Sequence, residues 1–103
     1  MLKPNEIATL QKLLKRKDDR LPIVFSALGD PRRCTIFRSF LRNERLCVSD
    51  VARLVDMSMS LASQHLKVLE VTGLVVREKE GRTVYYRANT DDELVRAITK
   101  AVN

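Results

Sequence analysis

The side chains with the clearest chemical capacity in this 103-residue chain lie between residues 59 and 82. Their chemistry suits duplex DNA, because Gln can pair with adenine through two hydrogen bonds, Lys reaches guanine or phosphate, and Ser suits either. Arginine and lysine in the later part of this stretch would contact phosphates. The candidates for base contacts are Met59, Ser60, Ser63, Gln64 and Lys67, and the candidates for phosphate contacts are Arg77, Lys79 and Arg82.

The first group requires a helix that turns its polar side outward. Ala62, Leu66 and Leu69 stand at i, i+4 and i+7, which predicts a helix to about residue 71 with these three side chains buried. Ser58 has the residue type of an N-cap. A shorter helical segment at about 49–55 precedes it, and only three or so residues join the two. The sequence therefore predicts a helix-turn-helix over about 49–71.

The second group requires a β-hairpin. From Gly73 onward the apolar period changes from 3.6 to 2, and residues 74–78 and 82–87 are rich in β-branched and aromatic types. Gly81 supplies the glycine that a short hairpin loop needs. A two-stranded wing at about 74–88, directly after a helix-turn-helix, predicts one winged helix-turn-helix domain over 1–103, mainly α. In such a fold the second helix of the pair enters the major groove and the hairpin reaches the flanking backbone or the minor groove.

Two short helices are expected in the first half of the chain. Pro22 opens one at about 22–28, which Gly29 would end as a left-handed cap. Asp30 caps the next, at about 31–42, with Pro31 in its first turn. The second of these helices turns four apolar side chains toward a core: Ile36, Phe37, Phe40 and Leu41.

Two further helices, at about 5–17 and 91–102, carry apolar stripes at opposite ends of the chain. Each stripe could pack only on the core of its own chain. Their presence at both ends instead favours a partner surface.

The composition supports a folded cytoplasmic protein. The chain is 45% apolar and 31% charged, with a net charge of +6, which is typical of a globular domain and suits a polyanionic partner. It has no apolar run of 18 residues and no leader-like start, so we expect neither membrane insertion nor secretion. Two cysteines and one histidine cannot supply a four-ligand zinc site without carboxylates, and no cofactor or small-molecule substrate is expected.

Five segments of the sequence closely resemble the ArsR/SmtB family of prokaryotic repressors, over about residues 24–90. They are 27–33 (ALGDPRR), 46–52 (LCVSDVA), 58–69 (SMSLASQHLKVL), 73–75 (GLV) and 80–86 (EGRTVYY). The resemblance implies a homodimeric repressor that binds an inverted repeat and releases DNA when an inducer binds. It also implies that the first and last helices form the dimer interface, here through Ile7, Leu10, Leu14, Leu94, Val95, Ile98 and Val102.

The family's sensor sites are incomplete in this sequence. Its arsenic and cadmium sensors carry a Leu-Cys-Val-Cys-Asp pattern, whereas residues 46–50 read Leu-Cys-Val-Ser-Asp, and a soft metal needs at least two thiolates. Its zinc and nickel sensors use histidine on the last helix, and none stands there. We predict no metal site. Cys34 is interpreted as a small core residue in preference to a sensing thiol, and His65 as a hydrogen-bonded structural residue in preference to a ligand. Cys47 stays open between packing and a sensing thiol.

Two other classes of function are alternatives to a DNA-binding regulator. A winged helix can dock a protein through its recognition face, and the salt dependence of binding distinguishes this alternative. An enzyme lacks support, because no nucleophile stands beside the histidine and the chain has no glycine-rich phosphate loop. The sequence identifies no inducer, metal or otherwise, and a family member that regulates without any metal inducer remains an alternative.

Overall fold

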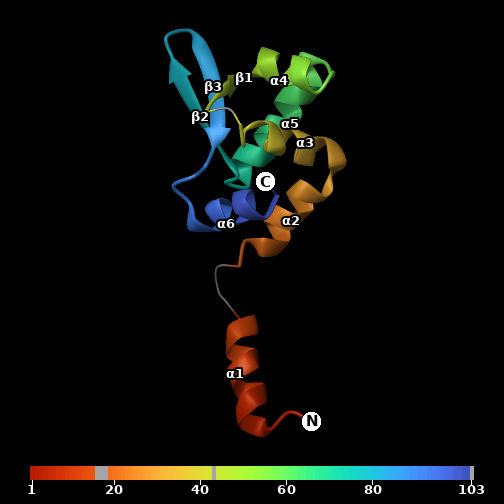
Figure 1. The fold of residues 1–103 in the computed structure, drawn as a ribbon, viewed down its shortest axis with the longest axis vertical. Coiled ribbons are helices and arrows are strands. Elements are labelled where there is room, and N and C mark those ends of the chain that lie inside the picture. Colours follow the sequence, from red (N-terminus) through yellow and green to blue (C-terminus); the bar gives the residue numbers. More distant parts are fainter. Residues whose placement is uncertain (16–18, 43, 103) are drawn as a thin grey trace.

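The computed structural model describes residues 1–15, 19–42 and 44–102, and it confirms the winged helix-turn-helix (Figure 1). Within those ranges the helices are α1 (Pro4–Leu14), α2 (Leu21–Gly29), α3 (Pro31–Ser39), α4 (Val48–Leu54), α5 (Met59–Val71) and α6 (Glu93–Val102), and the strands are β1 (Leu46–Cys47), β2 (Val75–Glu80) and β3 (Thr83–Ala88). Helices α4 and α5 form the helix-turn-helix, and β2 and β3 form the wing. Both lie at the end of the molecule opposite α1.

The core lies between α3, α5 and the base of the wing. Ile36 and Phe37 of α3 are fully buried, as are the three α5 side chains whose spacing predicted burial, Ala62, Leu66 and Leu69. Burying a large apolar side chain contributes about 1.5–3 kcal/mol relative to leaving it exposed. This packing fixes the rotation of α5 about its axis, and so it determines which of its side chains face solvent.

The sheet differs from the prediction, because it has three strands in the order β1-β3-β2 instead of two. Leu46 pairs with Tyr86 and Cys47 with Tyr85, in antiparallel register. A strand of two residues is too short for an alternating pattern to reveal, which explains why the sequence did not predict it. Within the wing, β2 and β3 pair in antiparallel register, from Val75 opposite Ala88 to Glu80 opposite Thr83. Gly81 lies in the turn at φ +63°.

Several predicted element ends were wrong by one to three residues. Gly29 is the last residue of α2 and not a left-handed cap, because the left-handed glycines of the described chain are Gly73 and Gly81. Helix α3 ends at Ser39 instead of residue 42. Helix α1 ends at Leu14, and residues 16 and 17 of the predicted helix lie outside the described residues. Helix α6 begins at Glu93, since the Asp92 carboxylate accepts the Leu94 and Val95 amides.

Helix α1 stands apart from the body of the molecule, which measures 58 × 26 × 21 Å in all (Figure 1). Its predicted stripe faces solvent, since Ile7, Leu10 and Leu14 are 42%, 43% and 81% exposed. A helix of 11 residues is marginally stable on its own in water. The α1 stripe therefore needs an apolar surface that the described part of its own chain does not give it.

Candidate nucleic-acid interface

The polar side of α5 is free. Met59, Ser60, Ser63, Gln64 and Lys67 are all exposed, as their helical spacing predicted. The Ser58 hydroxyl accepts the Leu61 amide at 3.1 Å and so caps the first turn. A tight turn with Asp56 at φ +52° joins α4 to α5. An α-helix fits the major groove of B-DNA, so this exposed side has the size and chemistry for reading base edges.

His65 lies on the inner side of α5 and is only 9% exposed. Its Nε2 has no hydrogen-bond partner among the described residues, so the structure gives the expected hydrogen-bonded role no support at this nitrogen. The Asp30 carboxylate is near enough to His65 to interact with it electrostatically. The pKa of Asp30 is lowered chiefly by the hydrogen bond from the Arg33 amide. His65 therefore packs inside the molecule and does not reach a DNA groove.

The wing carries its free cations on one face and near the turn. The register places Arg77 opposite Tyr86 and Lys79 opposite Val84, on the same face as buried Val75. Arg77, Lys79 and Arg82 are exposed, and within the described chain none of them takes part in an ion pair. Unpaired cations are the groups that phosphates bind. The core-facing side of the wing thus continues as a basic surface toward its tip.

The opposite face of the wing pairs its charges internally. Glu78 binds Arg87, and Glu80 binds Arg45, whose guanidinium lies 4.1 Å from the centre of the Tyr85 ring. The hydrogen bond with Glu78 raises the pKa of Arg87, and that with Glu80 raises the pKa of Arg45. Both arginines thus remain charged and neutralise the two carboxylates. The sequence does not predict the Arg45–Glu80 pair because Arg45 is placed by the unpredicted strand β1.

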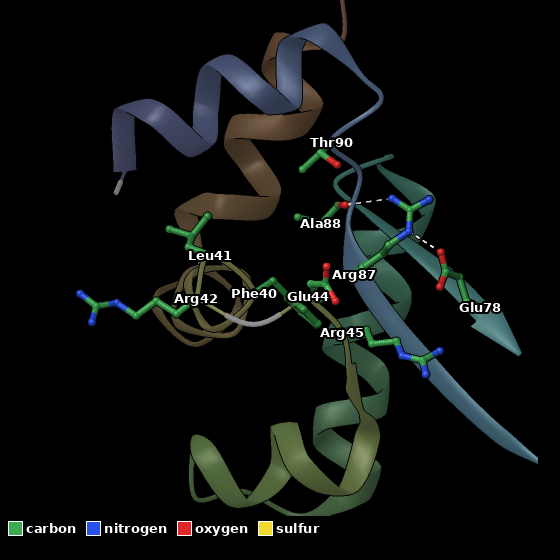
Figure 2. Close-up of a pocket in the computed structure, with 9 residues that line it drawn as sticks. All are labelled: Phe40, Leu41, Arg42, Glu44, Arg45, Glu78, Arg87, Ala88 and Thr90. Atoms are coloured by element: carbon green, nitrogen blue, oxygen red, sulfur yellow. Dashed lines mark hydrogen bonds and ion pairs between the residues drawn. The ribbon is translucent and has the colours of Figure 1, made fainter. Parts of the chain in front are cut away.

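A cavity of about 590 Å³ opens beside this outer face, between α3, β3 and the start of α6 (Figure 2). Phe40, Leu41 and Ala88 contribute its apolar surface, and Arg42, Arg45 and Arg87 contribute cations. Figure 2 shows the Arg87 side chain bonded to Glu78. Because two of the three arginines already bind carboxylates, the cavity does not have the charge of an anion-binding site.

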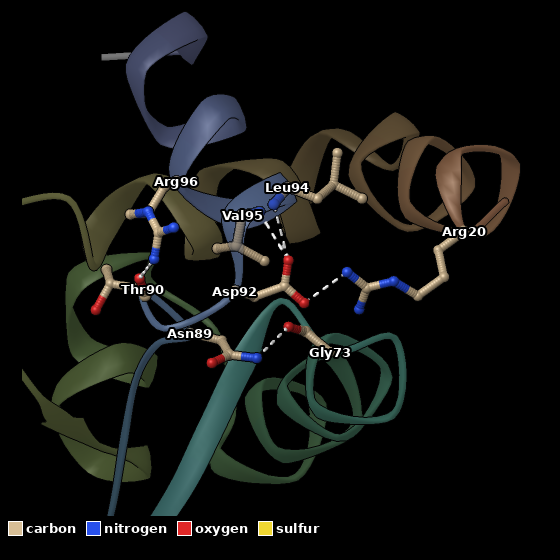
Figure 3. Close-up of polar contacts among 8 residues, drawn as sticks. All are labelled: Arg20, Gly73, Asn89, Thr90, Asp92, Leu94, Val95 and Arg96. Atoms are coloured by element: carbon tan, nitrogen blue, oxygen red, sulfur yellow. Dashed lines mark hydrogen bonds and ion pairs between the residues drawn. The ribbon is translucent and has the colours of Figure 1, made fainter. Parts of the chain in front are cut away.

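A polar network joins α2, the end of α5, the base of the wing and α6 (Figure 3). Arg20 pairs with Asp92 at 2.5 Å, and the Asn89 amide nitrogen donates to the Gly73 carbonyl at 3.0 Å. Partial burial acts to raise the pKa of Asp92, but the Arg20 hydrogen bond and the capped amides outweigh it and hold that pKa below 3.8. This network connects the terminal helix to the end of α5 and to the base of the wing.

Replacing Asp92 by Asn should make the stability less dependent on acid pH. The lowered pKa in the folded state means that the charged form stabilises the fold above the ordinary value of 3.8 and that this contribution is lost as pH falls through the folded value. Asn keeps a capping oxygen but not the charge. Urea unfolding of both proteins from pH 7 to pH 3 should show a stability difference that shrinks below about pH 4. A constant difference would contradict this.

Gly73 and Gly29 should respond oppositely to replacement by Ala. Gly73 has φ +82°, and a Cβ there would lie 2.9 Å from the Arg20 guanidinium, so we expect a loss of about 1–2 kcal/mol. Gly29 is helical and a Cβ there meets nothing within 4 Å, so we expect a gain of about 0.4–1 kcal/mol. Chemical denaturation of both variants measures the contrast, and equal effects would refute it.

The predicted dimer residues divide into two groups. Ile7, Leu10 and Leu14 are exposed, and Leu94 and Val102 are partly exposed. Val95 and Ile98 are 1% and 8% exposed and belong to the core of their own chain, so the expectation that they face a partner does not fit their burial. The apolar stripe of α6 includes residues that pack in the core of their own chain and residues that could face a partner. Sequence periodicity alone cannot assign each residue to one of these two groups.

Cys47 and Cys34 are free thiols, and both are half-buried. Cys34 lies outside the buried core in which it was expected. The Cys47 thiol donates to Asp50 at 3.2 Å and lies 3.1 Å from the Ser49 hydroxyl. One thiol, one hydroxyl and one carboxylate do not fit the thiolate-rich site that cadmium or arsenite prefers. Among the described residues, no cluster of three His, Cys, Asp or Glu could hold a metal ion.

The fold and the exposed face of α5 define a winged helix-turn-helix protein. Residues 30–76 match the family model described as "Bacterial regulatory protein, arsR family", and the chain belongs to the ArsR family. It is similar to the HlyU transcriptional regulator from Vibrio vulnificus CMCP6, with a TM-score of 0.72 and 31% identity over 95% of this chain and 94% of that one.

Two other relatives carry informative names. The homodimeric winged helix-turn-helix DNA-binding domain of Mb0332 from Mycobacterium bovis, a possible ArsR-family regulator, has a TM-score of 0.71 and 26% identity over 98% of this chain and 83% of that one. A cadmium resistance regulatory protein CadC homolog from Staphylococcus aureus is 39% identical over 75% of this chain. The chain spans 62% of that protein and 52% of two further CadC proteins. Among the described residues, none of the helices has both the length and the apolar character that a transmembrane span requires.

Proposed function

We propose that this protein is a cytoplasmic, homodimeric transcriptional repressor that binds double-stranded DNA. The observation that carries the proposal is the exposed polar side of α5 beside the free cations of the wing. Gln64 and Lys67 read base edges in the major groove, with Ser60, Ser63 and Met59 around them. Arg77, Lys79 and Arg82 bind phosphates of the flanking backbone. The role is that of a regulator and not of an enzyme, in keeping with the family.

A two-fold dimer explains the exposed stripe of α1. Ile7, Leu10 and Leu14, together with the free edges of Leu94 and Val102, bury against the second copy. The name of the Mb0332 structure as homodimeric supports the same state for this chain. Two recognition helices then lie about one helical turn, near 34 Å, apart, so the operator is a pseudo-palindrome.

The inducer that releases this repressor from DNA is an unidentified metal or thiol-reactive signal. The names of the CadC relatives support a metal signal, and the half-buried Cys47 thiol supports a thiol-reactive one. A gel shift with DNA upstream of the gene, titrated separately with arsenite, zinc, cadmium and a persulfide, identifies the class. Release by thiol-reactive compounds should be lost in Cys47→Ser, and full release in that variant would dismiss Cys47.

The groove assignment is tested by two substitutions on duplexes selected from a random-sequence library. Gln64→Ala should cost about 1–3 kcal/mol of binding and relax preference at one base pair of each half-site. Arg82→Ala should instead weaken binding to all sequences similarly. Unchanged affinity and base preference in Gln64→Ala would show that α5 does not read the groove. Val71→Ala, an exposed change near the far end of α5, is the matched control.

A further inference from the structure

The outer face of the wing holds two carboxylates close to the tip, where DNA phosphates approach. Glu80 is the last residue of β2, beside the Gly81 turn and Arg82, and Glu78 lies two residues before it on the same face. A free carboxylate at this place would repel phosphates, because the Debye length at 0.1 M salt is about 10 Å and closer charges still interact. The wing can therefore bind DNA well only if these carboxylates are neutralised.

Arg45 reaches the tip from outside the hairpin. It precedes β1, which pairs with β3, and its guanidinium crosses the Tyr85 ring at 4.1 Å to bind Glu80. Figure 2 shows the Arg45 side chain extending from its loop toward β3. The contact thus joins the wing tip to the segment that leads directly into α4, the first helix of the helix-turn-helix.

We propose that Arg45 is a positioning residue for DNA binding, which neutralises Glu80 and holds the wing tip in place so that Arg77 and Lys79 meet the phosphates. The inference rests on the proposed DNA-binding function and extends it to a residue that itself touches no DNA. Glu78 is neutralised separately by Arg87, which also lies 3.7 Å from Asp91.

A purely structural role does not suit this pair. The Arg45 and Glu80 side chains are 40% and 66% exposed, and ion pairs this exposed add little to stability. Removal of either side chain should leave the fold intact and should instead change the affinity for DNA. Whether the affinity falls or rises depends on which of the two side chains is removed. Loss of Arg45 uncovers a carboxylate, whereas loss of the Glu80 charge uncovers a cation.

The test compares Arg45→Ala, Glu80→Gln and the double variant on one selected duplex. We expect Arg45→Ala to weaken binding about tenfold or more, Glu80→Gln to bind as well as wild type or better, and the double variant to recover to within about threefold of wild type. Arg42 is an exposed arginine on the rim of the same cavity and serves as the control. Adding Glu80→Gln to Arg42→Ala should not restore any DNA affinity that Arg42→Ala loses. A double variant as weak as Arg45→Ala would overturn the proposal, because neutralisation of Glu80 would then not be what Arg45 contributes to DNA binding. Wild-type affinity in Arg45→Ala would overturn it equally.

A second measurement on the free protein separates this proposal from the proposed function. In Arg45→Ala, the amides of Thr83 to Tyr85 should exchange with solvent at least several-fold faster, while those of α5 keep their rates. If the wild-type protein binds no duplex, the proposed function fails. Amide exchange rates of Thr83 to Tyr85 that stay unchanged in Arg45→Ala would overturn the positioning role of Arg45, whether or not the protein binds DNA. A melting temperature close to that of wild type verifies that the variant is folded.

Discussion

Raising the salt concentration from about 50 to about 200 mM is expected to weaken binding of the dimer to its selected duplex by about 10³- to 10⁵-fold. The reason is counterion release, since each phosphate neutralised by Lys or Arg frees a condensed cation. Arg77, Lys79 and Arg82 of each wing and Lys67 of each α5 are exposed to make such contacts. They amount to several phosphates for a dimer, in the range of about 6–10 that produces this slope.

The dependence is measured by fluorescence anisotropy over a series of salt concentrations. Arg82→Ala serves as an internal comparison, because its loss should flatten the slope by about one unit per half-site. A winged helix that docks a protein through α5 would respond to salt much less. A change in affinity below about tenfold over the same range would therefore support the protein-interaction alternative and contradict the phosphate contacts.

Replacing two leucines of α1 by glutamine is expected to convert the dimer to monomer and to reduce operator affinity by about 10²- to 10⁴-fold. Leu10 and Leu14 are 43% and 81% exposed in the single chain, so Leu10→Gln with Leu14→Gln removes no contact from its core. The loss follows because two linked half-sites bind far more tightly than one. Sedimentation velocity at micromolar concentration, followed by DNA titration, measures both effects.

The matched control for this variant is Lys12→Gln, which changes a side chain on the polar side of the same helix. It should leave the protein dimeric and its affinity near that of wild type. A double leucine variant that remains dimeric with full affinity would show that α1 lies outside the interface. Loss of the α-helical circular dichroism of the whole domain would instead reveal that α1 packs on its own core.

The recognition helix could be predicted from sequence because its determinants are local. Ser58 caps it, and the spacing of Ala62, Leu66 and Leu69 fixes its buried side, which the structure confirms. The exposure of Gln64 and Lys67 follows from the same periodicity. For these residues, the 3.6-residue period and a cap contain all the information that the prediction required.

The charge pairing of the wing could not be predicted because it depends on contacts between distant segments. Arg45 and Glu80 stand 35 positions apart in the sequence, and only the two-residue strand β1 brings them together. The sequence alone does not show that Glu80 is paired, whereas the structure pairs it with Arg45. In α6, likewise, the burial of Val95 and Ile98 depends on where the helix packs, which periodicity does not specify.

The most direct test of the DNA-reading side of α5 is the reactivity of guanine N7, a major-groove atom, in a selected operator bound by the dimer. We expect dimethyl sulfate to be excluded from two clusters of guanines centred about 10 base pairs apart, one for each recognition helix. The protection should weaken in Gln64→Ala. Guanines that stay fully reactive in a saturated complex would contradict the placement of α5 in the groove.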